Sequence, residues 1–192
     1  MTRGRAPDDS VRAFLALELP AAFRVRLGVL CAELRPSLDG VRWVRPEGIH
    51  LTLRFLGATS SAAIERLSPA VSQAAALCPP SRAPVRGLGV FPDRGSPRVL
   101  WLGLSVAEPV LTLQGACEAA AVRAGFEAEP RTFRAHLTLG RWRARAKRPP
   151  LPTVDLGDVH LDTLVLFRSQ PGPGGSVYTA LARFPLGAPM PS

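Results

Sequence analysis

One tetrapeptide, His-Leu-Thr-Leu, occurs twice in this chain, at residues 50–53 and 136–139, so that the copies lie 86 residues apart. Each copy falls in a segment that the apolar pattern predicts to be a strand. Side chains alternate between the two faces of a strand, so the His and Thr of each copy share one face and both leucines share the other. The repeat therefore indicates two related halves, each presenting an imidazole beside a hydroxyl.

Strands and helices are predicted in mixed order around the two motifs. Apolar residues at helical spacing predict helices at 21–35, 60–77 and 108–124. Strands are predicted at 12–19, 41–44, 49–56, 85–91, 98–104, 134–139, 159–167 and 177–184, with an exposed basic loop at 141–148. The segment 99–104 is apolar on both faces, which is typical of a central strand. Because hairpins interrupt the strand-helix alternation, the predicted fold class is α+β.

The length of 192 residues suffices for a single bilobal domain, with its core at about 11–186 and flexible tails at 1–10 and 187–192. Residues 1–10 are polar, and no apolar run approaches the roughly 18 residues of a membrane span. The sequence thus predicts a soluble, cytoplasmic protein without membrane association. We expect a monomer, since no unpaired apolar stripe stands out.

The formal net charge of +9 favours binding of a polyanion such as nucleic acid. Lys147 is the only lysine, however, and a composition this rich in arginine, alanine, glycine and proline also arises from genome base composition, so charge alone does not decide between the two. Cys31, Cys78 and Cys117 lack the close spacing of a zinc site and are interpreted as buried free thiols.

Two imidazoles and two hydroxyls that converge on one cleft suit the hydrolysis of a phosphodiester. A neutral imidazole can accept a proton from water while a protonated one donates to the departing oxygen, and the ordinary pKa of histidine allows both states near neutrality. One His-x-Thr pair alone is more often a polar strand face, but two identical copies favour catalysis by His50 and His136. Without a His-Glu-x-x-His or a phosphate-binding glycine loop, we expect no metal and no cofactor.

From about Arg12 to Leu186, the chain resembles the two-histidine (2H) phosphoesterases, and among them the RNA 2′,3′-cyclic phosphodiesterases, also called 2′-5′ RNA ligases or LigT-like proteins. Beyond the two motifs, the resemblance lies in residues 12–17 (RAFLAL), Trp43, 54–57 (RFLG), 99–103 (VLWLG), 133–136 (FRAH), Gly140-Arg141, 167–169 (FRS) and 175–178. Ala135 departs from the family, whose members often carry proline there.

The resemblance implies a LigT-like fold of two pseudo-symmetric lobes of antiparallel sheet, with helices outside and a central cleft. It implies hydrolysis of an RNA 2′,3′-cyclic phosphate end, on tRNA fragments or oligonucleotides, to a 2′-phosphomonoester without a metal, and ligation as the reverse reaction. By this analogy His50 protonates the leaving 3′ oxygen, His136 activates water, and Thr52 and Thr138 hold the phosphate.

Three arginines compete for the substrate phosphate. Arg141 matches a phosphate-contacting arginine of the family, although strand alternation places it on the leucine face unless Gly140 marks a bulge. Arg134 and Arg54 share the face of the neighbouring histidines without any such assumption.

Among the aromatic residues, Phe14 is interpreted either as a stacking surface for the terminal base or as core, whereas Phe55 is predicted to be core. Tyr178 is a weaker candidate for the cleft edge, and His160 is interpreted as structural. Two other functions stay open: a related 2′-5′ or nucleotide cyclic phosphodiesterase activity, and a non-catalytic module that binds RNA ends.

Overall fold

The computed structural model describes residues 10–172 and 175–187. Residues 1–9 and 188–192, which make up most of the two predicted tails, lie outside the described residues. The elements follow one another as β1 (Val11–Leu17), α1 (Ala21–Leu34), β2 (Val41–Trp43), β3 (Leu51–Thr59), α2 (Ser61–Leu77), β4 (Ser81–Phe91), β5 (Val99–Leu104), α3 (Glu108–Arg123), β6 (His136–Trp142), β7 (Asp155–Leu161), β8 (Thr163–Gly172) and β9 (Gly175–Pro185). The predicted α+β class is confirmed.

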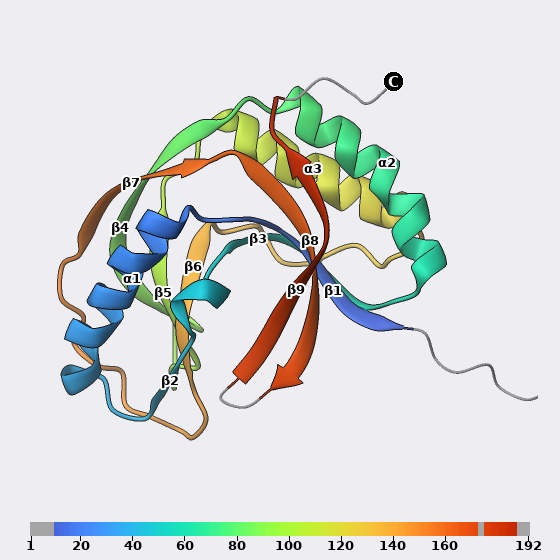
Figure 1. Cartoon of the computed structure of the whole chain (residues 1–192). Helices are drawn as coiled ribbons and strands as arrows, with labels where there is room; N and C mark the ends of the chain where they lie inside the picture. The colour runs from blue at the N-terminus through green and yellow to red at the C-terminus, as the bar shows by residue number, and fades with distance from the viewer. Residues whose placement is uncertain (1–9, 173–174, 188–192) are drawn as a thin grey trace, which may run out of the picture.

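Within the described residues, nine strands form one antiparallel sheet in the order β7-β4-β5-β6-β3-β1-β8-β9, with β2 paired to β6. The sheet curls about its middle, where β6 meets β3 (Figure 1). Along this order four strands lie on each side of the junction, with β2 added at β6, which agrees with the predicted pseudo-symmetry. The central position predicted for residues 99–104 is also confirmed, because β5 lies between β4 and β6.

The helices cover the outside of the curled sheet (Figure 1). The helix α1 lies on the half that contains β7, where the Arg26 guanidinium donates to the Leu156 carbonyl, and it buries an apolar stripe that includes Phe23, Leu27 and Leu34. The helices α2 and α3 pack against each other and against β9 and β3 of the opposite half. A single apolar cluster runs beneath both halves, so the two lobes share one core.

The predicted strand 159–167 is wrong in one respect, because the chain breaks it at Asp162. The strand β7 ends at Leu161 and pairs with β4, whereas β8 begins at Thr163 and pairs with β1 on the other side of the sheet. Asp162 makes this crossover, accepting from the Thr163 hydroxyl at 2.8 Å and, through its carbonyl, from the Leu186 amide. A change of partner strand leaves no mark in an apolar pattern, which records only which face is buried.

Other local predictions hold. The Ser60 hydroxyl accepts from the Ala63 amide and caps α2, and all three cysteines are buried and free. The strand β6 extends to Trp142, so the predicted basic loop begins later than Arg141. Among residues 10–172 and 175–187, none of the helices combines the length and apolar character needed to cross a membrane.

Candidate active site

The two repeated motifs meet at the junction of the sheet halves. In the described structure, β3 and β6 are joined through one paired position, Leu51 opposite Leu137. Both leucines are fully buried, because each points from the sheet into the common core. The strands diverge on either side of this pair, and the divergence leaves a cleft on the opposite face.

The register of this pair fixes how the polar residues of the motifs lie. Antiparallel strands that match Leu51 with Leu137 bring His50 across from Thr138, and Thr52 across from His136. The register therefore sets each histidine opposite the threonine of the other motif. This diagonal arrangement places four groups on one face, as the strand alternation predicted.

Each motif also carries a β-bulge at its last leucine. Between β1 and β3 the pairing passes from Thr52 to Arg54 and leaves out Leu53, and between β5 and β6 it passes from Thr138 to Gly140 and leaves out Leu139. A bulge adds one residue to a strand and reverses the faces of all residues that follow. The bulge foreseen near Gly140 is thus present, and an equivalent bulge in β3 was not foreseen.

The two bulges bring Phe55 and Arg141 to the cleft. Each is the fifth residue after the histidine of its motif, so the pair occupies equivalent positions in the two halves. The prediction that Phe55 is core is wrong, because its side chain is 51% exposed. Arg141 reaches the cleft face from which simple alternation excluded it.

The same inversion removes Arg54 from the cleft. Its guanidinium is buried, pairs with the Glu118 carboxylate of α3, and donates to the carbonyls of Phe55 and Glu127. A buried arginine whose donors are engaged in this way holds the end of β3 to α3. The prediction that Arg54 competes for the phosphate is therefore wrong.

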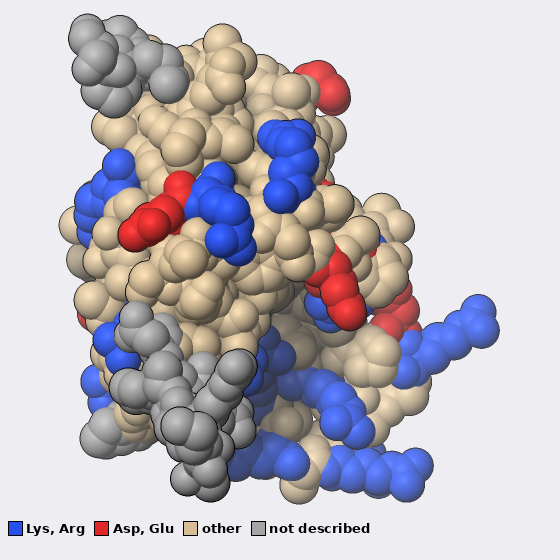
Figure 2. Space-filling model, turned by 90° about the vertical axis from the view of Figure 1, so that its right-hand side faces the viewer, with Lys and Arg blue, Asp and Glu red and all other residues tan. Residues whose placement is uncertain are grey.

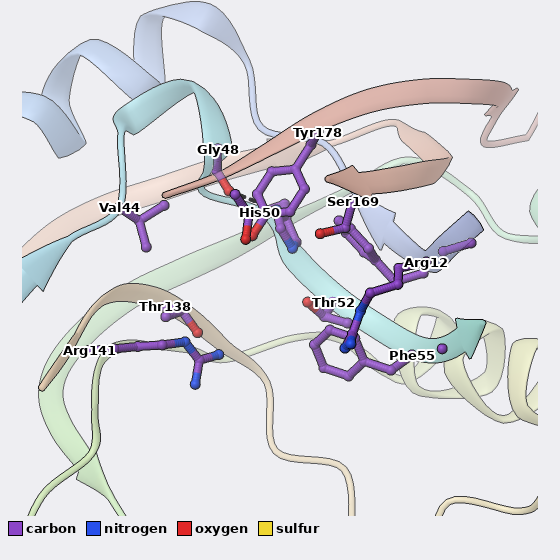
Figure 3. Close-up of a pocket in the computed structure, with 14 residues that line it drawn as sticks. Arg12, Val44, Gly48, His50, Thr52, Phe55, Thr138, Arg141, Ser169 and Tyr178 are labelled. Atoms are coloured by element: carbon purple, nitrogen blue, oxygen red, sulfur yellow. Dashed lines mark hydrogen bonds between the residues drawn. The ribbon is translucent and has the colours of Figure 1, made fainter. Parts of the chain in front are cut away.

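A cavity of about 290 Å³ lies in the cleft. Thr138 and Arg141 form one side of it, Thr52, Phe55 and Arg12 form the other, and His50 lies above them beside Gly48 and Tyr178 (Figure 3). The remaining lining residues include Phe14, Val44, Ser169, Ser176 and Tyr178. Among residues 10–172 and 175–187, no three His, Cys, Asp or Glu side chains group in a way that could hold a metal ion.

Both catalytic candidates are fixed in the same tautomer. The Nδ1–H of His50 donates to the Gly48 carbonyl at 2.8 Å, and that of His136 donates to the Arg134 carbonyl at 2.6 Å. Because a carbonyl can only accept, Nδ1 must carry the hydrogen in each ring. Each neutral ring is left with Nε2 as its acceptor, the atom that can take or, once protonated, give a proton.

Aromatic rings enclose His50. Phe14 stacks on it with ring centroids 4.7 Å apart, Phe167 lies at 5.9 Å, and Tyr178 meets its edge at 5.2 Å. Phe14 is only 3% exposed, because the rings of Phe55, Phe167 and Tyr178 also contact it. The structure places the buried Phe14 ring against the histidine and in the cavity lining, and its stacking on a terminal base stays a prediction.

The imidazoles have lowered pKa values. Burial lowers the pKa of His50 to about 4, opposed by the bond to the Gly48 carbonyl and assisted by the charges of His136 and Arg24. Burial also lowers the pKa of His136, opposed by the Arg134 carbonyl and assisted by the charge of Arg141. The rings are close enough for the charge of one to act on the other.

The Arg134 side chain is directed elsewhere. Its guanidinium pairs with Asp93 at 2.8 Å and lies over the Phe91 and Trp101 rings, with centroid distances of 4.7 and 5.7 Å. Arg134 does not line the cavity, although its backbone carbonyl holds His136. Its predicted contact with substrate stays a prediction, and the geometry favours Arg141 for that role.

Arg12 and Ser169 belong to the cavity but were not proposed from the sequence. They face each other in the register between β1 and β8. Arg12 shares a strand face with Phe14, which was a usable signal, since both lie two residues apart on β1. Ser169 stood out only as part of the 167–169 segment that resembles the family, because its place in the cavity depends on β8 returning beside β1.

The lowered pKa of His50 makes a testable contribution to stability. The unfolded ring binds a proton below about pH 6.5, whereas the folded ring does so only near pH 4, so stability is lost as the pH falls between these values. We expect a His50→Asn variant to gain stability relative to the wild type, by up to about 3 kcal/mol, on going from pH 7 to pH 4.

Urea unfolding at both pH values measures this difference. A His160→Asn variant is the control, because His160 is exposed and lies far from the cavity in the sheet order. If His50→Asn changed the free energy of unfolding by the same amount at pH 7 and pH 4, the expectation would be contradicted.

Comparisons with known proteins fit this geometry. A family model described as LigT like phosphoesterase matches residues 17–101. The chain is 32% identical to an RNA 2′,3′-cyclic phosphodiesterase of Methanothermobacter thermautotrophicus, over 92% of this chain and 99% of the relative. It is 34% identical to an RNA 2′,3′-cyclic phosphodiesterase of Thermus thermophilus, over 92% of this chain and 90% of the relative.

Solved structures share the fold. Escherichia coli LigT complexed with 3′-AMP superposes with a TM-score of 0.82 at 26% identity, covering 93% of this chain and 99% of that chain. TT0787 of Thermus thermophilus superposes with a TM-score of 0.80 at 34% identity, covering 92% of this chain and 98% of that chain. The LigT-like fold that the family resemblance implied is confirmed.

Proposed function

The chain belongs to the LigT-like phosphoesterase family, and we propose that it hydrolyses the 2′,3′-cyclic phosphate at the end of an RNA to a 2′-phosphomonoester. The observation that carries this proposal is the pair of imidazoles held in the same way through Nδ1: His50 lines the cavity, and His136 lies on β6 two residues before Thr138, which also lines it. The similarity to RNA 2′,3′-cyclic phosphodiesterases supplies the substrate class. A LigT structure with bound 3′-AMP is consistent with a nucleotide in this cleft.

In the proposed reaction, His136 Nε2 takes a proton from water as the water oxygen attacks phosphorus. The bond from phosphorus to the 3′ oxygen breaks, and protonated His50 gives its proton to that oxygen. The products are a 2′-phosphomonoester and a free 3′ hydroxyl. The assignment of the two roles follows the family resemblance.

The lowered pKa of His50 bears on when it gains its proton. In the free protein His50 is neutral at pH 7, because its pKa is about 4. A phosphodiester anion bound beside the ring raises that pKa, since an opposite charge favours the protonated form. Substrate binding thus helps to load the acid that the reaction needs.

The cavity residues divide into two groups around the substrate. Arg141 and the hydroxyls of Thr52 and Thr138 serve the phosphate, where negative charge builds in the transition state. The exposed ring of Phe55 offers the stacking surface for the terminal base, in place of buried Phe14, which orients His50.

Product analysis of an oligonucleotide with a 2′,3′-cyclic phosphate end tests the proposal. We expect a 2′-monophosphate as the product and activity that persists in EDTA. Formation of a 3′-monophosphate, or loss of activity in EDTA with recovery on adding zinc, contradicts the reaction as written. Binding of the RNA end without turnover identifies a non-catalytic module instead.

The kind of RNA substrate and the oligomeric state are also part of this proposal. We expect tRNA fragments or other oligonucleotides as substrates and a monomer as the active form. A 2′-5′-linked substrate and a nucleotide cyclic phosphate are assayed in parallel with the RNA. Preferred hydrolysis of either one identifies a related activity of the same two motifs. Because ligation reverses transesterification, joining of an RNA 5′ hydroxyl end to the cyclic phosphate is tested with the same preparation.

A further inference from the structure

A second groove opens from the catalytic cavity. Its volume is about 620 Å³, roughly twice that of the cavity. The groove is formed by β2 and the segment after it, the end of β6, and the start of β9: Arg42, Trp43, Val44, Arg45, Glu47, Gly48, Arg141, Trp142, Arg143 and 175–178. Arg141 and Tyr178 line both spaces, so a chain that leaves the cavity between them enters the groove directly.

The groove is strongly basic. Four arginines line it, Arg42, Arg45, Arg141 and Arg143, against a single acidic residue, Glu47. On the face of the molecule seen in Figure 2, Lys and Arg side chains gather around a hollow in the lower part, while the upper part carries fewer charges. A groove with this charge attracts the phosphates of a nucleic acid.

The opposite exit from the cavity, past Phe55, has a different character. The groove there is lined by Arg54, Glu127 and Glu129. Glu118 neutralises Arg54, so this lining offers a polyanion no uncompensated positive charge among the described residues. The charges therefore distinguish the two exits and favour the basic one for a polynucleotide.

Apolar surface accompanies the arginines of the basic groove. The Val177 side chain is 47% exposed, and Trp43 is half-buried with one surface against Arg35. Trp142, although part of the groove lining, contributes little exposed apolar surface, because it is 8% exposed and its indole N–H donates to the Asp39 carbonyl. Basic side chains beside apolar surface are what single-stranded nucleic acid binds without sequence preference.

We propose that this groove binds the RNA strand on the 5′ side of the cyclic phosphate, and that it makes the protein prefer oligonucleotides over cyclic mononucleotides. The proposal rests on the proposed function, since it extends the same site along the substrate. The groove takes single-stranded RNA, whose phosphates contact Arg42, Arg45 and Arg143 while Arg141 stays with the reacting phosphate.

The test compares kcat/KM for adenosine 2′,3′-cyclic phosphate and for a tetraadenylate with the same cyclic end. We expect the wild type to prefer the tetranucleotide, and the preference to shrink between about 50 and 200 mM salt. A double variant, Arg45→Gln with Arg143→Gln, is expected to lower kcat/KM for the tetranucleotide on the order of tenfold and to flatten its salt dependence, while the mononucleotide is unaffected.

The control is a second double variant, Arg82→Gln with Arg123→Gln. It makes the same change of net charge with two exposed arginines that line neither the cavity nor the groove. We expect wild-type rates for both substrates from this control.

The outcomes separate the two proposals. Equal kcat/KM of the wild type on both substrates, or an equal loss of kcat/KM in the two double variants, contradicts RNA binding in the groove. Neither result contradicts the proposed function. If the wild type turns over neither substrate, the proposed function is contradicted, and so is the role of the groove in binding the substrate. Loss of mononucleotide turnover in the Arg45→Gln, Arg143→Gln variant shows a general effect on the cavity and also contradicts the groove.

Discussion

Replacing either His50 or His136 with asparagine is expected to lower kcat on an RNA 2′,3′-cyclic phosphate end by about 10²- to 10⁴-fold. The Asn side-chain amide can still donate to the carbonyl that each imidazole Nδ1 contacts now, but it has no counterpart of Nε2. The variant therefore removes the reacting nitrogen and keeps the local anchor. Single-turnover kinetics, with RNA-end affinity measured in parallel, separates loss of chemistry from loss of binding.

The two asparagine variants differ in what restores them. A substrate with sulfur in place of the 3′ bridging oxygen departs as a thiolate, which needs no protonation because thiols are far stronger acids than alcohols. With this substrate, the activity of His50→Asn is expected to return, whereas His136→Asn is expected to stay inactive. Return of activity in His136→Asn alone reverses the two roles, and wild-type activity of either variant on the natural substrate contradicts the acid-base pair.

Replacing Arg141 with glutamine is expected to lower kcat by about 10²- to 10³-fold, comparable to the loss of one donor to a developing oxyanion. Arg141 lines the cavity beside Thr138, and its charge also lowers the pKa of His136. Removal of that charge raises the pKa of His136. If His136 acts as the base, the acidic limb of the pH profile should therefore move to higher pH.

Arg134→Gln is the matched control for Arg141→Gln. Arg134 also carries a charge that lowers the pKa of His136, but its side chain is paired with Asp93 outside the cavity. We expect only a small loss of kcat, accompanied by a shift of the pH profile in the same direction. A larger loss from Arg134→Gln than from Arg141→Gln would reverse the assignment of the phosphate-binding arginine.

Much of this site could be predicted from the sequence, because the information lies in local patterns. Strand alternation follows from the backbone alone, so two His-Leu-Thr-Leu copies predicted which face each His and Thr occupies. Helix periodicity and the Ser60 cap depend equally on neighbours in the chain. The resemblance then placed these elements in a known architecture, which the structural comparisons confirmed.

The errors share one physical origin. Phe55 and Arg54 were assigned to the wrong faces because a bulge at Leu53 inverts the strand beyond it, and the bulge is defined by pairing with β1. The break at Asp162 likewise depends on β8 changing partner. A bulge or crossover lowers the free energy only through contacts with a distant strand, and these contacts leave no period in the local sequence.

By itself, the sequence determined the repeated motif, the two imidazoles and hydroxyls with their shared faces, and the helices that cover the sheet. Only the tertiary structure decided that Arg141 and Phe55 turn into the cleft, that Arg54 turns away, and that Arg12 joins from β1. The physical reason is that alternation is a property of one strand, whereas register, bulges and the meeting of β3 with β6 are properties of strands that are paired.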